Sequence, residues 1–258
     1  MILRRRWQPS THNDLTAKED HSMNTHRKTA IVVGVLFIIA TAFLFIGQSV
    51  YQPILDSSEY LEIAYPQRIT VSIGILLEFA CVIAIPLIPV FMFPVLRKHS
   101  ETLAIGYVGI RIIEGVVFLI VAVIGLLSLL ALSQEFVEVG AAGGAHFQTI
   151  GALLLSAHDW AYVIGGQVVF SVSALILNYV LFQSRLVPRF ISVWGLIGAV
   201  LILAGGISAM FDLFAEASVL ETVIFLPIAV QEMVLAVWLI AKGFNLQILA
   251  SRLGNTQV

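Results

Sequence analysis

Six long apolar segments restrict the fold of this chain more than any other feature. A helix that crosses a bilayer needs about 20 consecutive, mostly apolar residues. Six stretches meet that length, at residues 29–50, 70–96, 103–133, 160–182, 190–213 and 223–244. Their apolar character is continuous rather than alternating, which favours helices over strands. The sequence therefore predicts an all-α polytopic membrane protein, a bundle of six transmembrane helices.

The composition supports a chain embedded in lipid. Of its 258 residues, 59% are hydrophobic and 12% are charged, whereas soluble domains carry about 25% charged residues. The formal net charge of −2 leaves no basic footprint for a nucleic-acid partner. A lone cysteine, Cys81, excludes an internal disulfide, and its apolar neighbours suggest a packed thiol.

The distribution of Lys and Arg predicts the orientation of the helices. Basic residues favour the cytoplasmic side of a membrane. With both termini in the cytoplasm, 12 of the 14 basic residues fall on that side. They are Arg4, Arg5, Arg6, Lys18, Arg27, Lys28, Arg97, Lys98, Arg185, Arg189, Lys242 and Arg252. The predicted outer loops carry acidic residues instead: Asp56, Glu59, Glu62, Glu135, Glu138, Asp212, Glu216 and Glu221.

Three regions follow along the chain. Residues 1–26 are polar and aperiodic, so we expect a disordered cytoplasmic tail, with Met23 as an alternative start. Residues 27–245 form the six-helix transmembrane domain, and residues 246–258 a cytoplasmic C-terminal tail. The segment "SQEFVEVGAAGGAHFQT" predicts a long outer loop. The apolar "IGALLLSAHDW" after it is too short to span, so it either extends the fourth helix outward or lies along the interface.

Four charged residues interrupt the apolar segments: Glu78, Arg111, Glu114 and Glu232. At 1.5 Å per residue, all four fall within a turn or two of mid-bilayer depth. A charge there costs roughly 2.5–3.5 kcal/mol. We therefore expect these side chains, with the neighbouring Gln231, to face the interior of the bundle and to meet there.

Three carboxyls and one guanidinium do not balance in a low-dielectric interior. We expect Arg111 to pair with one glutamate while at least one other carboxyl stays protonated near neutral pH. Such a cluster is either a binding site for a small molecule, a lipid or a proton, or a structural group that fixes the packing of the helices. The sequence leaves both open.

A second candidate group is Ser156, His158 and Asp159 in the motif "SAHDW". Adjacent helical positions point about 100° apart, so these three cannot form a serine–histidine–carboxylate relay among themselves. A polar cap at the outer interface is the favoured interpretation, and surface catalysis is the alternative. No tight ligand spacing supports a metal site, and the sequence contains no G-x-S-x-G, Walker A or H-E-x-x-H motif.

Four blocks of sequence resemble one known family. They are "YVGIRIIEGVV", "HDWAYVIGG", "SRLVPRFISVWGLIGAVL" and "LPIAVQEMVLAVWLIAKGF". Together they resemble the bacterial membrane family called domain of unknown function 4386, over roughly residues 29–245. The resemblance implies a multi-pass protein of the bacterial inner membrane, and it carries no activity, substrate or catalytic residue to transfer.

These observations favour a non-enzymatic membrane protein, a transporter or its accessory, that binds a small molecule, a lipid or a proton within the bundle. The alternatives are an enzyme that acts on a lipid or cell-wall precursor at the outer face, and a structural or sensory subunit. The predicted partners are the lipid bilayer and the bound species. Six spans fit a complete bundle or half of a homo-oligomeric carrier.

Overall fold

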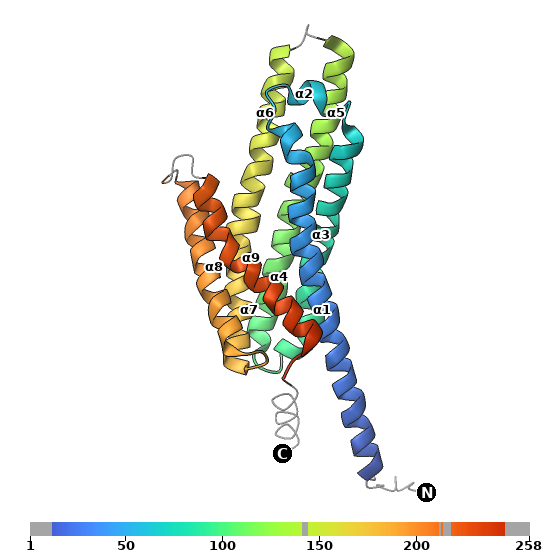
Figure 1. Cartoon of the computed structure of the whole chain (residues 1–258), viewed down its shortest axis with the longest axis vertical. Helices are drawn as coiled ribbons and strands as arrows, with labels where there is room; N and C mark the ends of the chain where they lie inside the picture. Colours follow the sequence, from blue (N-terminus) through green and yellow to red (C-terminus); the bar gives the residue numbers. More distant parts are fainter. Residues whose placement is uncertain (1–11, 141–143, 212, 214–217, 246–258) are drawn as a thin grey trace, which may run out of the picture.

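The protein is a bundle of long helices. The computed structural model describes residues 12–140, 144–211, 213 and 218–245. Within them, six helices are long and apolar enough to cross a membrane: Asn24–Leu55, Arg68–Leu96, Glu101–Val139, Gly144–Ser184, Arg189–Met210 and Val223–Ala241 (Figure 1). The predicted fold class, an all-helical bundle with six candidate spans, is confirmed.

Two of the six spans are interrupted by a π-helical turn, which divides each into three elements. In chain order the elements are α1 (His12–Leu55), α2 (Tyr60–Ile63), α3 (Arg68–Leu96), α4 (Glu101–Val117), the π-helical η1 (Phe118–Val123), α5 (Ile124–Val139), α6 (Gly144–Ala161), the π-helical η3 (Tyr162–Val169), α7 (Phe170–Ser184), α8 (Arg189–Met210) and α9 (Ser218–Ala241).

The N-terminal region differs from its prediction. Helix α1 begins at His12, so residues 12–26 are helical where the sequence predicts a disordered tail. The polar composition gives this stretch a low hydropathy, but it does not prevent helix formation. The helix of the first span therefore extends through it. Residues 1–11 and the predicted C-terminal tail, 246–258, lie outside the described residues.

The predicted outer loop at residues 133–149 is mostly helical. Helix α5 continues to Val139, Gly140 ends it with a φ of 71°, and α6 begins at Gly144. Polar pairs one turn apart support the helix here, with Gln134 donating to Glu138 at 2.9 Å. The apolar segment before Trp160 extends the fourth span outward, which was one of the two predicted arrangements.

The far ends of these helices form a compact cap. The short helix α2 packs against α5 (Figure 1). The hydroxyl of Ser133 donates to the carbonyl of Leu61 at 2.6 Å and accepts from the backbone N–H of Tyr65 at 2.9 Å. The acidic residues at this end are Asp56 and Glu59 in the turn before α2, Glu62 on α2, and Glu135 and Glu138 on α5. We call this the acidic end.

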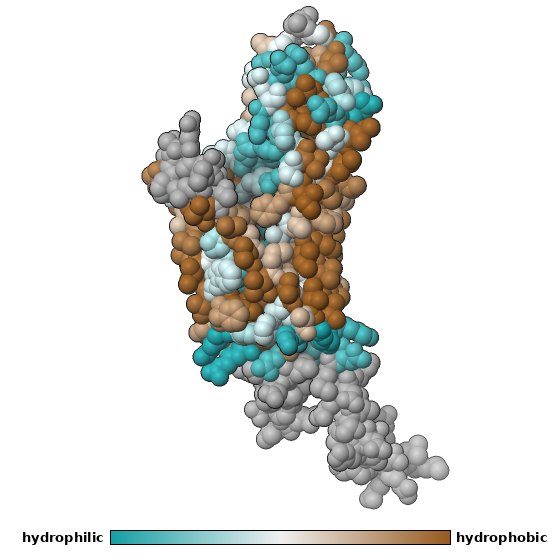
Figure 2. All heavy atoms as spheres, in the orientation of Figure 1, coloured by the Kyte–Doolittle hydropathy of each residue, from teal (hydrophilic) through white to brown (hydrophobic). Residues whose placement is uncertain are grey.

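The opposite end of the bundle is basic. Figure 2 shows hydrophilic residues along the lower edge of the apolar band on the visible face. The described basic residues at this end are Arg27, Lys28, Arg97, Lys98, Arg185, Arg189 and Lys242. Arg27 donates to the carbonyls of Leu239 (3.0 Å) and Ile240 (2.5 Å), and so satisfies the C-terminus of α9. This contact fastens the first spanning helix to the last.

The buried apolar side chains fall into separate clusters. One, towards the basic end, contains Phe37, Ile88, Met92 and Tyr107. A second, towards the acidic end, contains Tyr51, Phe118 and Leu126. On the third span, Arg111 and Glu114 lie between Tyr107 and Phe118, so the main charged group of the protein sits where these two apolar clusters meet.

Candidate functional site

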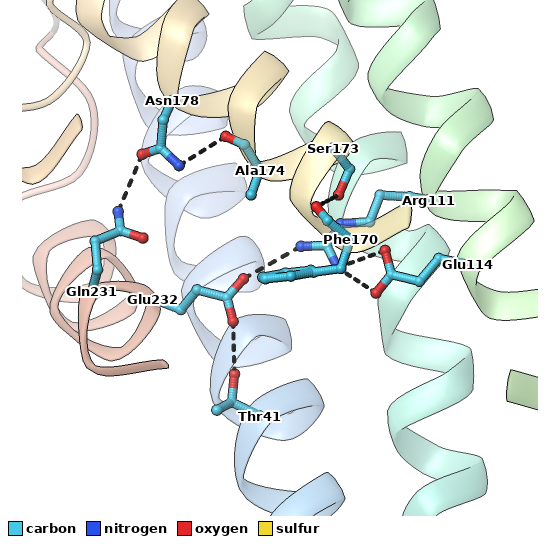
Figure 3. A network of polar contacts seen from close by, with 9 residues as sticks. All are labelled: Thr41, Arg111, Glu114, Phe170, Ser173, Ala174, Asn178, Gln231 and Glu232. Atoms are coloured by element: carbon cyan, nitrogen blue, oxygen red, sulfur yellow. Dashed lines mark hydrogen bonds and ion pairs between the residues drawn. The ribbon is translucent and has the colours of Figure 1, made fainter. Parts of the chain in front are cut away.

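Arg111, Glu114 and Glu232 form one buried charged group, which we call the charged triad (Figure 3). The Arg111 Nη1 lies 3.0 Å from Glu114 Oε1 and 3.3 Å from Oε2. The Nη2 of the same guanidinium lies 3.4 Å from Glu232 Oε1. Arg111 and Glu114 are each 3% exposed. The guanidinium therefore bridges two carboxylates contributed by α4 and α9.

The positions of the triad follow from local helix geometry. Arg111 and Glu114 are three residues apart on α4, which places them on the same face. Glu232 lies at the middle of the span Val223–Ala241 and reaches Arg111 from the facing side. Its other oxygen accepts from the hydroxyl of Thr41 on α1 at 3.1 Å. Three spanning helices thus contribute to one group at the centre of the bundle.

Two aromatic rings border the guanidinium. The Arg111 Cζ lies 5.1 Å from the ring centroid of Phe170 and 5.8 Å from that of Tyr107. Both distances are within the range of a cation–π contact. Within the described residues, the Nε of Arg111 and the hydroxyl of Tyr107 are buried without a hydrogen-bond partner, although Tyr107 is close enough to the guanidinium to interact with it electrostatically.

The charges of the triad do not cancel when all three groups are ionised. One guanidinium and two carboxylates leave a net charge of −1, and a single added proton makes the group neutral. The Thr41 hydroxyl can donate to an ionised carboxylate or accept from a protonated one. The triad can therefore gain or lose one proton without losing a hydrogen-bond partner.

Glu78 does not join the triad, in contrast to the expectation from the sequence. It belongs to a second buried group with Tyr51, His158 and Tyr162, which we call the tyrosine–histidine cluster. Tyr162 donates to Glu78 Oε1, and Tyr51 donates to Oε2 at 3.1 Å. The Tyr51 oxygen also lies 3.2 Å from His158 Nε2 and 3.2 Å from the Tyr162 oxygen. The tautomer of His158 determines whether Tyr51 or His158 donates in their contact.

This cluster reaches the protein surface through Asp159. The Nδ1 of His158 lies 3.5 Å from Asp159 Oδ1, and the Asp159 side chain is 73% exposed. His158 itself is buried. The polar contacts therefore run without a break from an exposed carboxylate through His158 and Tyr51 to the buried Glu78.

The cluster lies closer to the acidic end of the bundle than the triad does. Helix α8 has 22 residues, about 33 Å at 1.5 Å per residue, which matches a hydrocarbon core of about 30 Å. A Cβ at Gly206 of α8 would meet the Gln167 side chain at 2.9 Å. The two helices are antiparallel, so five residues towards the acidic end means counting forward from Gly206 and backward from Gln167. Phe211 is therefore level with Tyr162. Glu78, bonded to Tyr162, is thus at the level where α8 ends.

The two π-helical turns border both polar groups. Element η1 begins four residues after Glu114, and η3 begins at Tyr162. The rings of Phe118 and Tyr162 pack edge to face at 5.1 Å. A π-helical turn redirects the side chains of a helix and often marks a functional segment. Cys81 lies between the two groups, close enough to Glu78 and to all three triad residues to interact electrostatically.

The remaining predicted residues lie elsewhere. Gln231 points away from its neighbour Glu232 and donates to Asn178 Oδ1 (3.2 Å) and to the carbonyl of Ile191 (3.2 Å), as Figure 3 shows for Asn178. Ser156 is exposed and contributes to neither group. The structure therefore separates the predicted central site into the triad, the Gln231–Asn178 pair and the tyrosine–histidine cluster.

Sequence reasoning missed Thr41, Tyr51 and Tyr162. Each is a hydroxyl-bearing residue in or beside an apolar segment, but such residues also occur at lipid-facing positions and at interfaces. The one local signal was the spacing of His158 and Tyr162, which places them on the same helical face.

We expect Tyr51→Phe to lower the stability of the folded protein by about 1–3 kcal/mol, because His158 and Glu78 lose a buried hydrogen-bond partner. Reversible unfolding in mixed micelles measures the change. Tyr179→Phe is the matched control, since Tyr179 is 45% exposed and its loss should change stability by less than about 0.5 kcal/mol. Equal effects of the two substitutions would contradict the buried role of Tyr51.

Comparison with known proteins identifies the family but no characterised relative. No curated protein and no solved structure matches the sequence. One family model matches residues 32–243, which is most of the chain, and its description is "Domain of unknown function (DUF4386)". The match covers five of the candidate spans completely, the first span from residue 32 onward, and both polar groups. This multi-pass membrane protein belongs to the DUF4386 family.

Proposed function

We propose that the charged triad binds and releases a proton within a bacterial inner-membrane protein that acts as a transporter or as an accessory to one. The basic end lies in the cytoplasm, since Lys and Arg favour that side. Both termini are then cytoplasmic, and the tyrosine–histidine cluster faces the outer leaflet. The observation that carries the proposal is the bridging of two buried carboxylates by one guanidinium.

A proton fits this site better than a larger ligand does. Both oxygens of Glu114 accept from Arg111, and the two oxygens of Glu232 are divided between Arg111 and Thr41. A small molecule or lipid would have to compete with these partners for the carboxylate oxygens. A proton adds to a carboxylate oxygen directly and removes the excess charge of the group.

Glu232 is the triad carboxyl best placed to exchange the proton. Its side chain is 15% exposed, against 4% for Glu114, and it faces a neutral hydroxyl as well as the guanidinium. Glu114 is held through both oxygens by the same nitrogen of Arg111. A change in the Glu232 charge would loosen the contact between α4 and α9, which offers a direct link between proton binding and helix movement.

The test is an infrared pH titration of the purified protein in lipid nanodiscs. We expect a protonated-carboxyl band at neutral pH that disappears on alkalinisation in the wild type and is missing from Glu232→Gln. Glu62→Gln is the matched control, because Glu62 is exposed at the acidic end, and it should leave the band intact.

Complete ionisation of all buried carboxyls at pH 7 would overturn the proposal. So would a titrating band that persists in both Glu232→Gln and Glu114→Gln, since the proton would then reside outside the triad.

The contact between His158 and Asp159 favours a second candidate, chemistry on a lipid or cell-wall precursor at the acidic end. A histidine placed between an exposed carboxylate and a tyrosine hydroxyl can act as a general base. In a strain with a measurable phenotype, His158→Ala separates the two functions from Glu232→Gln. Loss of protein function in Glu232→Gln alone supports the proton site in the triad. Loss of protein function in His158→Ala alone supports chemistry at the outer surface. Loss that follows only a failure of self-association or partner binding supports a structural or sensory subunit.

A further inference from the structure

A groove of about 450 Å³ opens at the basic end, between the α7–α8 turn and the end of α9. Arg185, Arg189 and Lys242 line it, together with Trp238. Small-molecule sites in proteins commonly enclose about 300–1,000 Å³. The groove is therefore large enough for a lipid headgroup, and it is separate from both polar groups in the interior.

The three cations of the groove have no internal counter-charge. Within the described chain, Arg185, Arg189 and Lys242 form no salt bridge, and the residues that line the groove include no Asp or Glu. The Arg189 guanidinium lies over the ring of Phe182, 5.0 Å from its centroid, which restrains that side chain beside the groove. Three uncompensated cations around one concavity attract an anion.

The helix ends add to the positive potential. Helix α8 begins at Arg189, so its N-terminal partial positive charge lies at the groove. The C-terminus of α9 would contribute the opposite charge, but Arg27 donates to the carbonyls of Leu239 and Ile240 and offsets it. The groove thus retains a positive helix end next to a largely compensated negative one.

Apolar side chains beside the groove favour a lipid over a free anion. Phe190 and Val193 on α8 are 59% and 40% exposed, and Val237 on α9 is 59% exposed. Each is next to, or one turn from, a residue of the groove, and they lie on the membrane side of it. Trp238 has the amphipathic ring that favours the headgroup level. A free phosphate would use the cations and leave this apolar surface without a role.

From this arrangement we infer that the groove binds the phosphate of an anionic phospholipid headgroup, with the acyl chains along Phe190 and Val237. Arg189 and Lys242 contact the phosphate from α8 and α9, and Arg185 contacts it from the turn. Basic pockets between spanning helices on the cytoplasmic side suit this class of lipid. The inference is independent of the proton site, because it shares no residue with the triad.

Native mass spectrometry of protein released from nanodiscs tests the inference, with phosphatidylglycerol and phosphatidylcholine in equal amounts as probes. We expect wild type to retain phosphatidylglycerol preferentially. Arg189→Gln with Lys242→Gln should reduce that retention roughly 30-fold, since two cations near an anionic headgroup are lost. Arg189→Lys keeps the charge and should retain most of the binding.

The matched control is Lys28→Gln with Arg97→Gln, which removes the same charge at the same end but outside the groove, and it should leave retention within about twofold. Equal losses in the two double variants would mean a general basic surface and would overturn the groove. Displacement of the lipid by millimolar inorganic phosphate would make the ligand a free anion and would overturn the lipid assignment. Circular dichroism and gel filtration confirm that each variant is folded.

Discussion

Replacing Arg111 with glutamine is expected to lower the free energy of unfolding by about 3–5 kcal/mol, because Glu114 and Glu232 stay buried without their shared cation. The Thr41 hydroxyl remains on Glu232 but supplies no charge. Protonation of the two carboxyls removes the unpaired charge, so the deficit should shrink at acidic pH. Reversible unfolding in mixed micelles at pH 5 and pH 8 measures both effects.

Two further variants separate the loss of the ion group from general damage at this position. The triple variant Arg111→Gln, Glu114→Gln, Glu232→Gln removes every charge of the triad, so it should recover a large part of the lost stability. Arg97→Gln removes an exposed arginine at the basic end and should cost less than about 0.5 kcal/mol. A triple variant less stable than Arg111→Gln alone would refute the charge argument.

Gly74→Ala is expected to destabilise the bundle by about 1–3 kcal/mol through overpacking. A Cβ at Gly74 would lie 2.6 Å from Tyr51 Cδ1 and 2.8 Å from the carbonyl oxygen of Gly47. The backbones of α1 and α3 approach this closely because two small residues face each other, as is common between membrane helices. Relief of the clash requires the helices to separate, which also displaces Tyr51 from Glu78.

Gly109→Ala provides the matched control for Gly74→Ala. Gly109 lies inside α4, and a Cβ there would meet nothing within 4 Å. Alanine favours a helix by about 0.8–1.0 kcal/mol over glycine, so this variant should be as stable as wild type or more so. Unfolding in mixed micelles ranks the two variants, and a ranking with Gly74→Ala above Gly109→Ala would contradict the close packing of α1 on α3.

The spanning segments could be predicted from sequence because the bilayer imposes a simple condition on each of them. About 20 apolar residues suffice, whichever helix lies alongside. The same criterion misses helix beyond the hydrocarbon, where α5 and α6 continue as polar helices and pack on each other through Phe136 and Phe147, 5.8 Å apart. A hydropathy criterion assigns such a stretch to a loop because it measures lipid compatibility and not helix formation.

The neighbours of each charged residue could be predicted only in part. Arg111 and Glu114 meet because they are three residues apart on one helix, which the sequence states directly. Their contact with Glu232 was expected from the cost of exposing charge to lipid. Glu78 is subject to the same cost, but hydrogen bonds from two tyrosine hydroxyls offset it. Tyr51 reaches Glu78 because α1 and α3 approach closely at Gly47 and Gly74. That approach depends on packing between separate segments, which periodicity does not encode.

Gln231 shows a second limit, that of direction. It directly precedes Glu232 in the sequence, so both are predicted to belong to one site, yet neighbouring positions differ by about 100° around a helix. Glu232 therefore faces α1 and α4, whereas Gln231 faces α7 and α8 and bonds to Asn178. Which side of α9 meets which helix is decided by the arrangement of the whole bundle.

The hydrogen bonds from Arg27 to the C-terminal carbonyls of α9 affect how the helices assemble as they insert into the membrane. Helices enter the membrane in the order of synthesis, so Arg27 and Thr41 are in place long before the ribosome reaches Glu232 and Leu239. During that interval Arg111 and Glu114 travel on one helix as a neutral pair, which lowers the barrier to their insertion. Arrival of α9 then supplies the second carboxylate and the carbonyls that Arg27 binds, so we expect insertion of α9 to complete both the interior ion group and the contact between α1 and α9.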